Sequence, residues 1–217
     1  MKQYVIYGDT GFAEEMYHII TLDGRDKVIA FTNDRAFLEK NTIFGLPVIP
    51  IDELTQALNE PYELLFAYGY TQMNYLREKV YRECKTLGMR IGKYISTNAI
   101  CYADNVEEGS MIWPNVYVGP GVKIGHCNII KASTTIAHDN MIGDFNYFAP
   151  GVVLGGRASV ANHCFIGLNS TVKNGIMLAD YTLLGSGSNM LKNSEKGEVY
   201  VGNPAKRLDK NSMELAI

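Results

Sequence analysis

The sequence predicts two parts of different architecture: an α/β domain built on a parallel sheet, followed by a solenoid of very short strands. Two observations in the 217-residue chain predict this fold. Residues 3–94 alternate strand-like and helix-like segments, and from residue 100 onward a large apolar residue recurs at every sixth position. A chain of this length suits two small domains, which we expect to cover residues 1–94 and 95–217.

The α/β part begins with the strand-like segment QYVIY, which is followed by the helical pattern GFAEEMYHIITL. KVIAFT, LPVIP and ELLFAYG read as further strands, and IDELTQAL and TQMNYLREKVYRECKTLG as further helices. Alternating strands and helices favour a parallel sheet, because right-handed crossovers pack the helices against its faces. This part is therefore predicted to be Rossmann-like.

The solenoid is predicted from a repeat of six residues. Ile100 and every sixth residue up to Met190 are apolar, sixteen positions without a break. Because only 47% of the chain is hydrophobic, a series of this length indicates a repeat rather than chance. The positions four residues further on are mostly small or β-branched, such as Ser110, Val116 and Thr134. Each hexapeptide is expected to form one short strand and a corner of a parallel β-helix, with its large side chain pointing inward.

Composition and charge argue against several classes of protein. A net charge of −3, without a long run of lysine or arginine, does not favour a nucleic-acid partner. The sequence shows no signal-peptide pattern and no apolar run long enough to span a bilayer, so we expect a cytoplasmic protein that does not contact a membrane. Its four cysteines form no CxxC pair, which argues against a metal site, and we expect them to be small apolar fillers.

The stretch TTIAHDNMIGDF sets His138 beside Asp139. Within the repeat, His138 falls on an outer corner after the inward-pointing Ile136, so its side chain is expected to be exposed. A neutral imidazole can take the proton of an attacking amine or hydroxyl near pH 7, and an adjacent carboxylate can orient the ring. A solvated turn histidine is the simpler interpretation of an isolated pair. The other histidines are assigned no chemistry: His18 and His126 at the surface and His163 at a turn.

The repeat is accompanied by VYVGNPAKRL after its last coil and by IYGDTGFAEE at the first strand. Together these motifs resemble the sialic-acid O-acetyltransferases and bacillosamine-type nucleotide-amino-sugar N-acetyltransferases, which are hexapeptide-repeat acyltransferases. The resemblance covers essentially the whole chain. It implies that the β-helix is left-handed, with three hexapeptides in each triangular coil, and that a homotrimer holds its active sites in grooves between neighbouring β-helices.

The same resemblance implies an activity. Such enzymes transfer the acetyl group of acetyl-CoA to an amino or hydroxyl group of a sugar, and the preferred acceptor is a nucleotide-linked amino sugar used for surface-glycan biosynthesis. No metal cofactor is expected.

The resemblance also assigns catalytic and cofactor residues. His138 aligns with the catalytic base of the family, and Asp139 with the carboxylate that follows it. Gly156 lies one coil further on, where a backbone N–H holds the thioester carbonyl in the family and where a missing side chain would leave room for the thioester. Four more residues are expected at the cofactor: Tyr147 at the thiol end, Leu168 and Ser186 along the pantetheine, and Asn174 two coils beyond His138.

The acceptor is expected at the carboxyl ends of the strands in the α/β domain, where helix N-termini converge. The residues concerned are Gly8, Thr10 and Gly11 in the first turn, Asn33 and Asp34 after the second strand, and Gly69 after a later one. A negative Asp9 in the first turn would repel a diphosphate. A simpler interpretation is that the glycines only close a turn and that Asp34 caps a short helix over RAFLEK.

Lys131 occupies a position that is usually an asparagine near the base in the family, and its cation could hold a carboxylate of the acceptor. Alternative functions are therefore O-acetylation of a free acidic sugar held by Lys131, or a non-catalytic nucleotide-sugar-binding or scaffolding protein. A zinc hydrolyase of the γ-carbonic-anhydrase type is disfavoured, because the histidine spacing offers no set of three that would converge on one ion.

Overall fold

The computed structural model describes residues 1–38 and 40–215. It begins with a five-stranded sheet in the order β3-β4-β2-β1-β5, in which β1 pairs in parallel with both β2 and β5. The strands of this sheet are β1 (Gln3–Tyr7), β2 (Lys27–Asn33), β3 (Thr42–Ile43), β4 (Leu46–Pro50) and β5 (Glu63–Phe66). The helices are α1 (Gly11–Asp23), α2 (Leu54–Ala57) and α3 (Tyr75–Thr86). The predicted Rossmann-like arrangement is confirmed.

Three predicted helices are shorter than their sequence patterns, and of IDELTQAL only α2 (Leu54–Ala57) is helical. The helix expected from Thr71 begins only at Tyr75, because Gln72, Met73 and Asn74 all have positive φ angles of 51–67° and form a left-handed turn. The helix expected over RAFLEK is a single 3₁₀ turn, η1 (Arg35–Phe37), and Glu39 lies outside the described residues. The carboxylate of Asp34 makes no capping hydrogen bond to this turn, so the capping interpretation of Asp34 is wrong.

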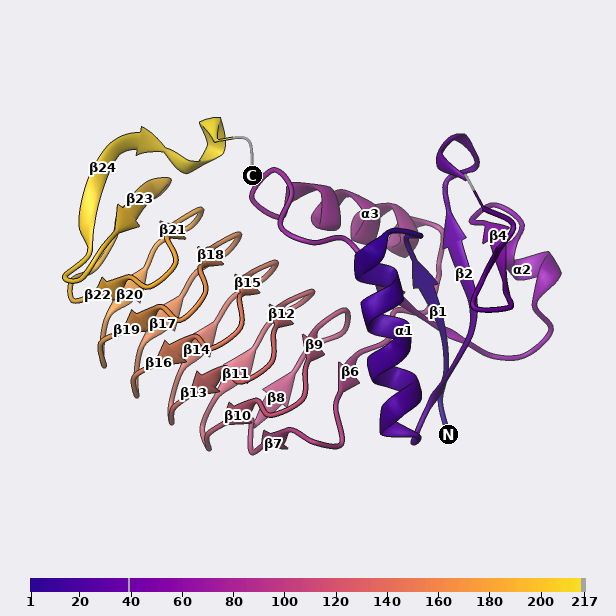
Figure 1. The fold of residues 1–217 in the computed structure, drawn as a ribbon, viewed down its shortest axis with the longest axis horizontal. Helices are drawn as coiled ribbons and strands as arrows, with labels where there is room; N and C mark the ends of the chain where they lie inside the picture. The colour runs from indigo at the N-terminus through magenta and orange to yellow at the C-terminus, as the bar shows by residue number, and fades with distance from the viewer. Residues whose placement is uncertain (39, 216–217) are drawn as a thin grey trace.

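The second part is the predicted left-handed β-helix, with strands of two residues stacked in three parallel sheets. Successive strands belong to face 1, face 2 and face 3 in turn, and Figure 1 shows the coils in a row that leads away from the α/β domain. The coil strands are β6 (Tyr94–Ile95), β7 (Ile100–Cys101), β8 (Asn105–Val106), β9 (Met111–Ile112), β10 (Tyr117–Val118), β11 (Lys123–Ile124), β12 (Ile129–Ile130), β13 (Thr135–Ile136), β14 (Met141–Ile142), β15 (Tyr147–Phe148), β16 (Val153–Leu154), β17 (Ser159–Val160), β18 (Phe165–Ile166), β19 (Thr171–Val172), β20 (Met177–Leu178), β21 (Leu183–Leu184) and β22 (Asn189–Met190). Face 1 runs from β6 to β21 and ends with the hairpin β23 (Glu198–Val201) and β24 (Lys206–Asn211), which precedes the 3₁₀ turn η2 (Ser212–Glu214).

Inward-pointing residues of the repeat form the core of the β-helix. Fifteen of the sixteen predicted positions are buried, from Val106 to Met190. The prediction is wrong for Ile100, which is 54% exposed, because Val118 pairs with Cys101 instead. The step from Cys101 to Val106 contains only five residues, so the first coil is one residue shorter than the coils after it.

The α/β domain is docked on face 1 of the β-helix, and its contacts reach from the first coil to Cys164 (Figure 1). The guanidinium of Arg77, which is fully buried, donates to backbone oxygens of both parts, including Tyr68 O (3.1 Å) and Cys127 O (2.9 Å). At the C-terminal end of α1, the Asp23 carboxylate accepts hydrogen bonds from Ser96 and Thr97 in the first coil. These polar contacts and one continuous apolar core fix the two parts in a single orientation.

Candidate active site

His138 and Asp139 form a hydrogen-bonded pair on an exposed corner between faces 2 and 3. His138 Nδ1 lies 2.8 Å from Asp139 Oδ2, and the two side chains are 51% and 59% exposed. Asp139 has a φ angle of 57°, and this left-handed turn after β13 directs both side chains outward. The exposed position predicted for His138 is confirmed, and the carboxylate leaves Nε2 as the ring nitrogen available to a substrate.

Gly156 lies directly beneath the imidazole ring. A Cβ on Gly156 would meet the imidazole first at Nε2 and would lie only 2.8 Å from Cε1, which is closer than real Cβ contacts allow. The space left by the missing side chain therefore holds the histidine ring, not the thioester as we expected. The Gly156 N–H makes no hydrogen bond to any described residue, so it remains available to an oxyanion as predicted.

The residues stacked at the His138 corner differ in their hydrogen bonding from those stacked at the neighbouring corner, between faces 3 and 1. There, each carboxylate or amide oxygen accepts a hydrogen bond from the N–H one coil earlier: Asp144 from His126 (2.7 Å), Asn162 from Asp144 (2.7 Å) and Asp180 from Asn162 (2.9 Å). The corresponding N–H groups of His138, Gly156 and Asn174 have no such side-chain partner within the described chain. The His138 corner is thus an edge of free backbone donors.

Lys131 does not present a free charge. Its side chain is 8% exposed, and Nζ lies 2.7 and 2.8 Å from the two carboxylate oxygens of Glu15 on α1. The ammonium also packs on the rings of Trp113 and Phe12, 3.7 and 4.7 Å from their centroids. Burial lowers the pKa of Lys131, against the opposing effect of Glu15. The expectation that Lys131 holds a carboxylate of the acceptor is corrected, because this charge is already paired within the chain.

Tyr147 lies on face 1, beneath the loop that leads into α3. Its ring stacks on Phe165 (5.6 Å between centroids) and meets the edge of Tyr70 (5.0 Å). Burial, followed by the charge of Glu15, raises the pKa of Tyr147 to about 12, so its hydroxyl remains a neutral donor. The charge of Glu15 thus acts on Tyr147 as well as on Lys131, and the sequence analysis had given this carboxylate no role.

The predicted site residues fall on two separate corners of the coil. Gly156 and Asn174 share the His138 corner between faces 2 and 3. The other set lies on face 1 or at the corner between faces 1 and 2: Lys131, Tyr147, Leu168 and Ser186. These two corners are the opposite ends of one side of the triangular coil, so one chain cannot bring both sets to the same atom.

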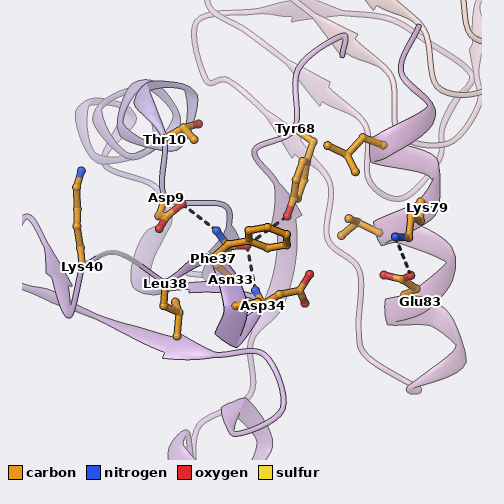
Figure 2. Close-up of a pocket in the computed structure, with 13 residues that line it drawn as sticks. Asp9, Thr10, Asn33, Asp34, Phe37, Leu38, Lys40, Tyr68, Lys79 and Glu83 are labelled. Atoms are coloured by element: carbon orange, nitrogen blue, oxygen red, sulfur yellow. Dashed lines mark hydrogen bonds and ion pairs between the residues drawn. The ribbon is translucent and has the colours of Figure 1, made fainter. Parts of the chain in front are cut away.

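A cavity of about 660 Å³ opens in the α/β domain at the carboxyl ends of β1 and β2. Figure 2 shows the polar residues that line it, among them Asp9, Asn33 and Asp34. Asn33 Nδ2 donates to Asp9 (2.8 Å), and the hydroxyl of Tyr7 donates to Asp34 (2.7 Å). Of the residues predicted to bind the acceptor, this cavity brings together Thr10, Asn33 and Asp34.

The three predicted glycines lie outside the lining of this cavity. Gly8 has a φ angle of 126°, and a Cβ there would lie 3.0 Å from Ala67, so this position needs glycine for a close turn between β1 and β5. Gly11 begins α1, and the carbonyl of Gly69 accepts a hydrogen bond from Arg77. The simpler interpretation of Gly8, as a turn residue, agrees with this geometry.

His163 packs within the structure and is not exposed as His138 is. His163 is buried at a corner between the rings of Phe145 and Tyr181, with Nε2 3.1 Å from Glu78.

Across residues 1–38 and 40–215, no three His, Cys, Asp or Glu side chains come together in a way that could hold a metal ion. Every helix in the same residues is too short or too polar to cross a membrane.

Comparison with known proteins matches both parts of the chain. Residues 3–84 match the PglD N-terminal domain family, and residues 105–138 match the bacterial transferase hexapeptide (six repeats) family. GDP-perosamine N-acetyltransferase of Escherichia coli O157:H7 is 24% identical over 185 residues, which are 81% of this chain and 80% of that protein.

Solved structures share the fold over almost the whole chain. PerB from Caulobacter crescentus, in complex with CoA and GDP-perosamine, superposes with a TM-score of 0.83 at 22% identity, covering 96% of this chain and 98% of that one. The acetyltransferase domain of PglB from Neisseria gonorrhoeae FA1090, in complex with acetyl coenzyme A, also gives 0.83, at 20% identity, with 95% and 99% covered. The chain therefore combines a PglD N-terminal domain with bacterial transferase hexapeptide repeats, and it is homologous to GDP-perosamine N-acetyltransferase.

Proposed function

We propose that this protein transfers the acetyl group of acetyl-CoA to the amino group of a nucleotide-linked amino sugar, with His138 as the general base. The observation that carries the proposal is the exposed His138–Asp139 pair over Gly156, in a chain homologous to GDP-perosamine N-acetyltransferase. Because a scaffolding protein has no need of a positioned base beside a free backbone donor, this geometry favours an enzyme over the non-catalytic alternative.

The chemistry of the corner follows from its groups. The amine of the acceptor attacks the thioester carbon, His138 Nε2 takes the proton that nitrogen must lose, and Asp139 stabilises the imidazolium. The free N–H of Gly156 lies on the same corner and can donate to the carbonyl oxygen as it gains charge. The imidazolium then protonates the departing sulfur of CoA.

The cavity in the α/β domain supports a nucleotide as the recognised part of the acceptor. Its volume of about 660 Å³ is in the usual range for a small-molecule site. Asp9, Asn33 and Asp34 offer oxygens that can accept hydrogen bonds from the N–H groups of a nucleobase. Because Lys131 is paired with Glu15, the rival interpretation of a free acidic sugar loses the cation on which it depended.

The separation of the two corners supports the predicted homotrimer. A neighbouring copy would bring its own Lys131 and Tyr147 toward His138, which a single chain does not do. Faces 2 and 3 are not covered by the α/β domain, and they expose apolar side chains suited to such a contact: Tyr117, Met141, Val153 and Met177. We place the reaction in the cytoplasm, where acetyl-CoA and nucleotide sugars are available.

An acceptor screen tests the proposal. The full chain is incubated with acetyl-CoA and with GDP-, UDP- and dTDP-linked amino sugars, free nonulosonic acids and amino acids, and release of free thiol is followed. We expect release with at least one nucleotide-linked amino sugar and none with the free acids. Release with a free acid alone, or with no acceptor at all, would contradict the proposal.

A further inference from the structure

Glu15 is a fixed carboxylate that the chemistry above does not use. Both of its oxygens contact the ammonium of Lys131, which is buried and packs against the rings of Trp113 and Phe12. The Glu15 side chain is nevertheless 47% exposed. The lysine therefore anchors the carboxylate from one side, while the other side faces solvent and keeps lone pairs for a further donor.

Glu15 is on α1, whose first turn adjoins the nucleotide cavity, and it contacts Lys131 on the β-helix. Thr10 lines the cavity, and Gly11 begins α1 with a free N–H that suits a phosphate. Glu15 is four residues further along the same face of the helix, about 6 Å along its axis. Tyr147 pairs with Ile129, two residues before Lys131, so the ion pair lies near the predicted cofactor end of the site. A sugar that follows a diphosphate at the start of α1 would therefore extend toward Glu15.

We propose that the Glu15 carboxylate binds the amino group of the acceptor and makes the protein selective for N-acetylation over O-acetylation. The inference rests on the proposed function, and it adds a specificity-determining residue to it. Lys131 acts as the positioning residue, because it fixes the carboxylate that meets the substrate.

The selectivity follows from the charges that the reaction creates. When the lone pair of the amine forms the bond to the thioester carbon, the nitrogen gains positive charge and the carbonyl oxygen gains negative charge. A carboxylate beside the nitrogen stabilises that positive charge until His138 of the neighbouring copy removes the proton. Collapse of the intermediate then breaks the C–S bond, and the sulfur takes the proton back from the imidazolium.

A hydroxyl acceptor gains much less from the same carboxylate. Its oxygen has to lose a proton early, since a protonated ether-like oxygen is far more acidic than an ammonium, and a nearby negative charge opposes that loss. An acceptor that carries its own carboxylate would be repelled by Glu15. The pair Glu15–Lys131 therefore favours an amine over both alternatives.

The variant Glu15→Gln tests the role directly. It keeps the size and the hydrogen-bonding shape of the side chain and removes its charge. With the amino sugar identified in the acceptor screen, we expect kcat/KM to fall by ~10–10² fold, the usual loss for a charge-assisted hydrogen bond. With the same nucleotide sugar carrying a hydroxyl in place of the amine, we expect the low parental rate to stay the same or to rise.

Two further variants separate this role from a structural ion pair. Glu14→Gln removes the neighbouring carboxylate, which is similarly exposed at 41% and also contacts a lysine, Lys40 at 3.3 Å; its selectivity should match the parent. Lys131→Met removes the anchor and should weaken N-acetylation less than Glu15→Gln does. The double variant of Glu15 and Lys131 should behave like Glu15→Gln alone, because the anchor has no effect once the carboxylate is lost.

The outcomes distinguish the inference from the function on which it rests. An active parent with Glu15→Gln unchanged, or with amine and hydroxyl acceptors reduced to the same extent, would overturn the role of Glu15 and leave the proposed function standing. A parent that acetylates no nucleotide-linked amino sugar would overturn the proposed function itself. Thermal unfolding of each variant shows whether a lost rate reflects a lost fold.

Discussion

His138 and His126 are two exposed corner histidines with different neighbours. His126 Nδ1 lies 3.2 Å from Asp144, so each ring has a carboxylate at hand. Only His138 stands over a glycine beside unpartnered N–H groups. A carboxylate beside a histidine is therefore not sufficient to identify a catalytic base on this β-helix. The unpartnered backbone N–H groups near His138 are what distinguish it from His126.

The first prediction compares these two histidines. His138→Asn should lower turnover by ~10²–10⁴, the usual contribution of a positioned general base, because asparagine cannot take the proton of the attacking amine. His126→Asn should stay within a few-fold of the parent. Thiol release at saturating acceptor measures both variants, and circular dichroism checks that each remains folded. Equal rates in the two variants would mean that His138 is not the base.

Gly156→Ala is expected to displace the base without removing it. The new methyl group would meet the imidazole of His138, which must rotate or shift away from its present position. Because this corner is exposed, the fold should tolerate the change, whereas turnover should drop by on the order of 10² from misplacement alone. A Gly156→Ala enzyme as fast as the parent would show that the ring position is not critical.

At this scale the exposed corner of His138 and the place of Gly156 one coil further on were predictable, because both depend on spacing within the repeat, whereas the roles given to them came from resemblance to a family. The sequence did not predict Glu15. An exposed glutamate on a helix is commonplace, and the partner that makes it distinctive is Lys131, 116 residues away in the chain. Only a folded structure brings those two charges together.

At the level of elements, the hexapeptide register was predictable because one side of every strand is inside the coil. A single five-residue step shifted Ile100 out of the core and put Cys101 in its place. A rule of constant spacing cannot detect one missing residue when the neighbouring residue is also apolar. The start of α3 was missed for a related reason, because Gln72, Met73 and Asn74 are not residues whose identity demands a left-handed turn.

The register can be tested by truncating two isoleucines. Ile136→Ala removes a fully buried side chain and should lower the free energy of unfolding by about 2–5 kcal/mol. Ile100→Ala, although it belongs to the same sequence series, should cost less than about 0.5 kcal/mol, because its side chain is 54% exposed. Denaturant titration of both variants measures the difference. Similar losses would indicate that Ile100 points inward after all.

At the scale of the whole molecule, the two parts are joined by polar groups buried beneath α3. Among residues 1–38 and 40–215, Arg77 has no carboxylate partner, and burial lowers its pKa to about 10. Next to it, His163 is enclosed by Phe145 and Tyr181 and meets Glu78. The handedness of the β-helix and the trimer came from resemblance to a family, because neither follows from residue spacing.

Burial at this junction makes stability depend on pH. Desolvation lowers the pKa of His163 below its ordinary value of 6.5, and the positive charge of Arg77 lowers it further. Glu78, the Met73 carbonyl and Asp180 oppose this shift but do not cancel it. The unfolded chain therefore binds more protons below about pH 6.5, so the stability contributed by neutral His163 is present above that pH and is lost as the pH falls below it.

When the pH is lowered from 7.5 to 5.5, the free energy of unfolding should fall less for His163→Gln than for the parent. His18→Gln, at an exposed histidine on α1, should lose as much as the parent. Denaturant titrations of the three proteins at both pH values measure this. Parallel losses in the parent and His163→Gln would show that His163 does not cause the pH dependence.

The placement of His138 and Glu15 at opposite ends of one side of the coil has a consequence for mixtures of defective chains. In the proposed trimer, each site takes its base from one copy and its carboxylate from the next, so a chain carrying His138→Asn and a chain carrying Glu15→Gln have complementary defects. Unfolding and refolding them together in equal amounts would create some sites with both intact residues, about a quarter if the chains assort at random. Two preparations that are nearly inactive alone would then regain activity when co-refolded, and mixing them without refolding would not have this effect.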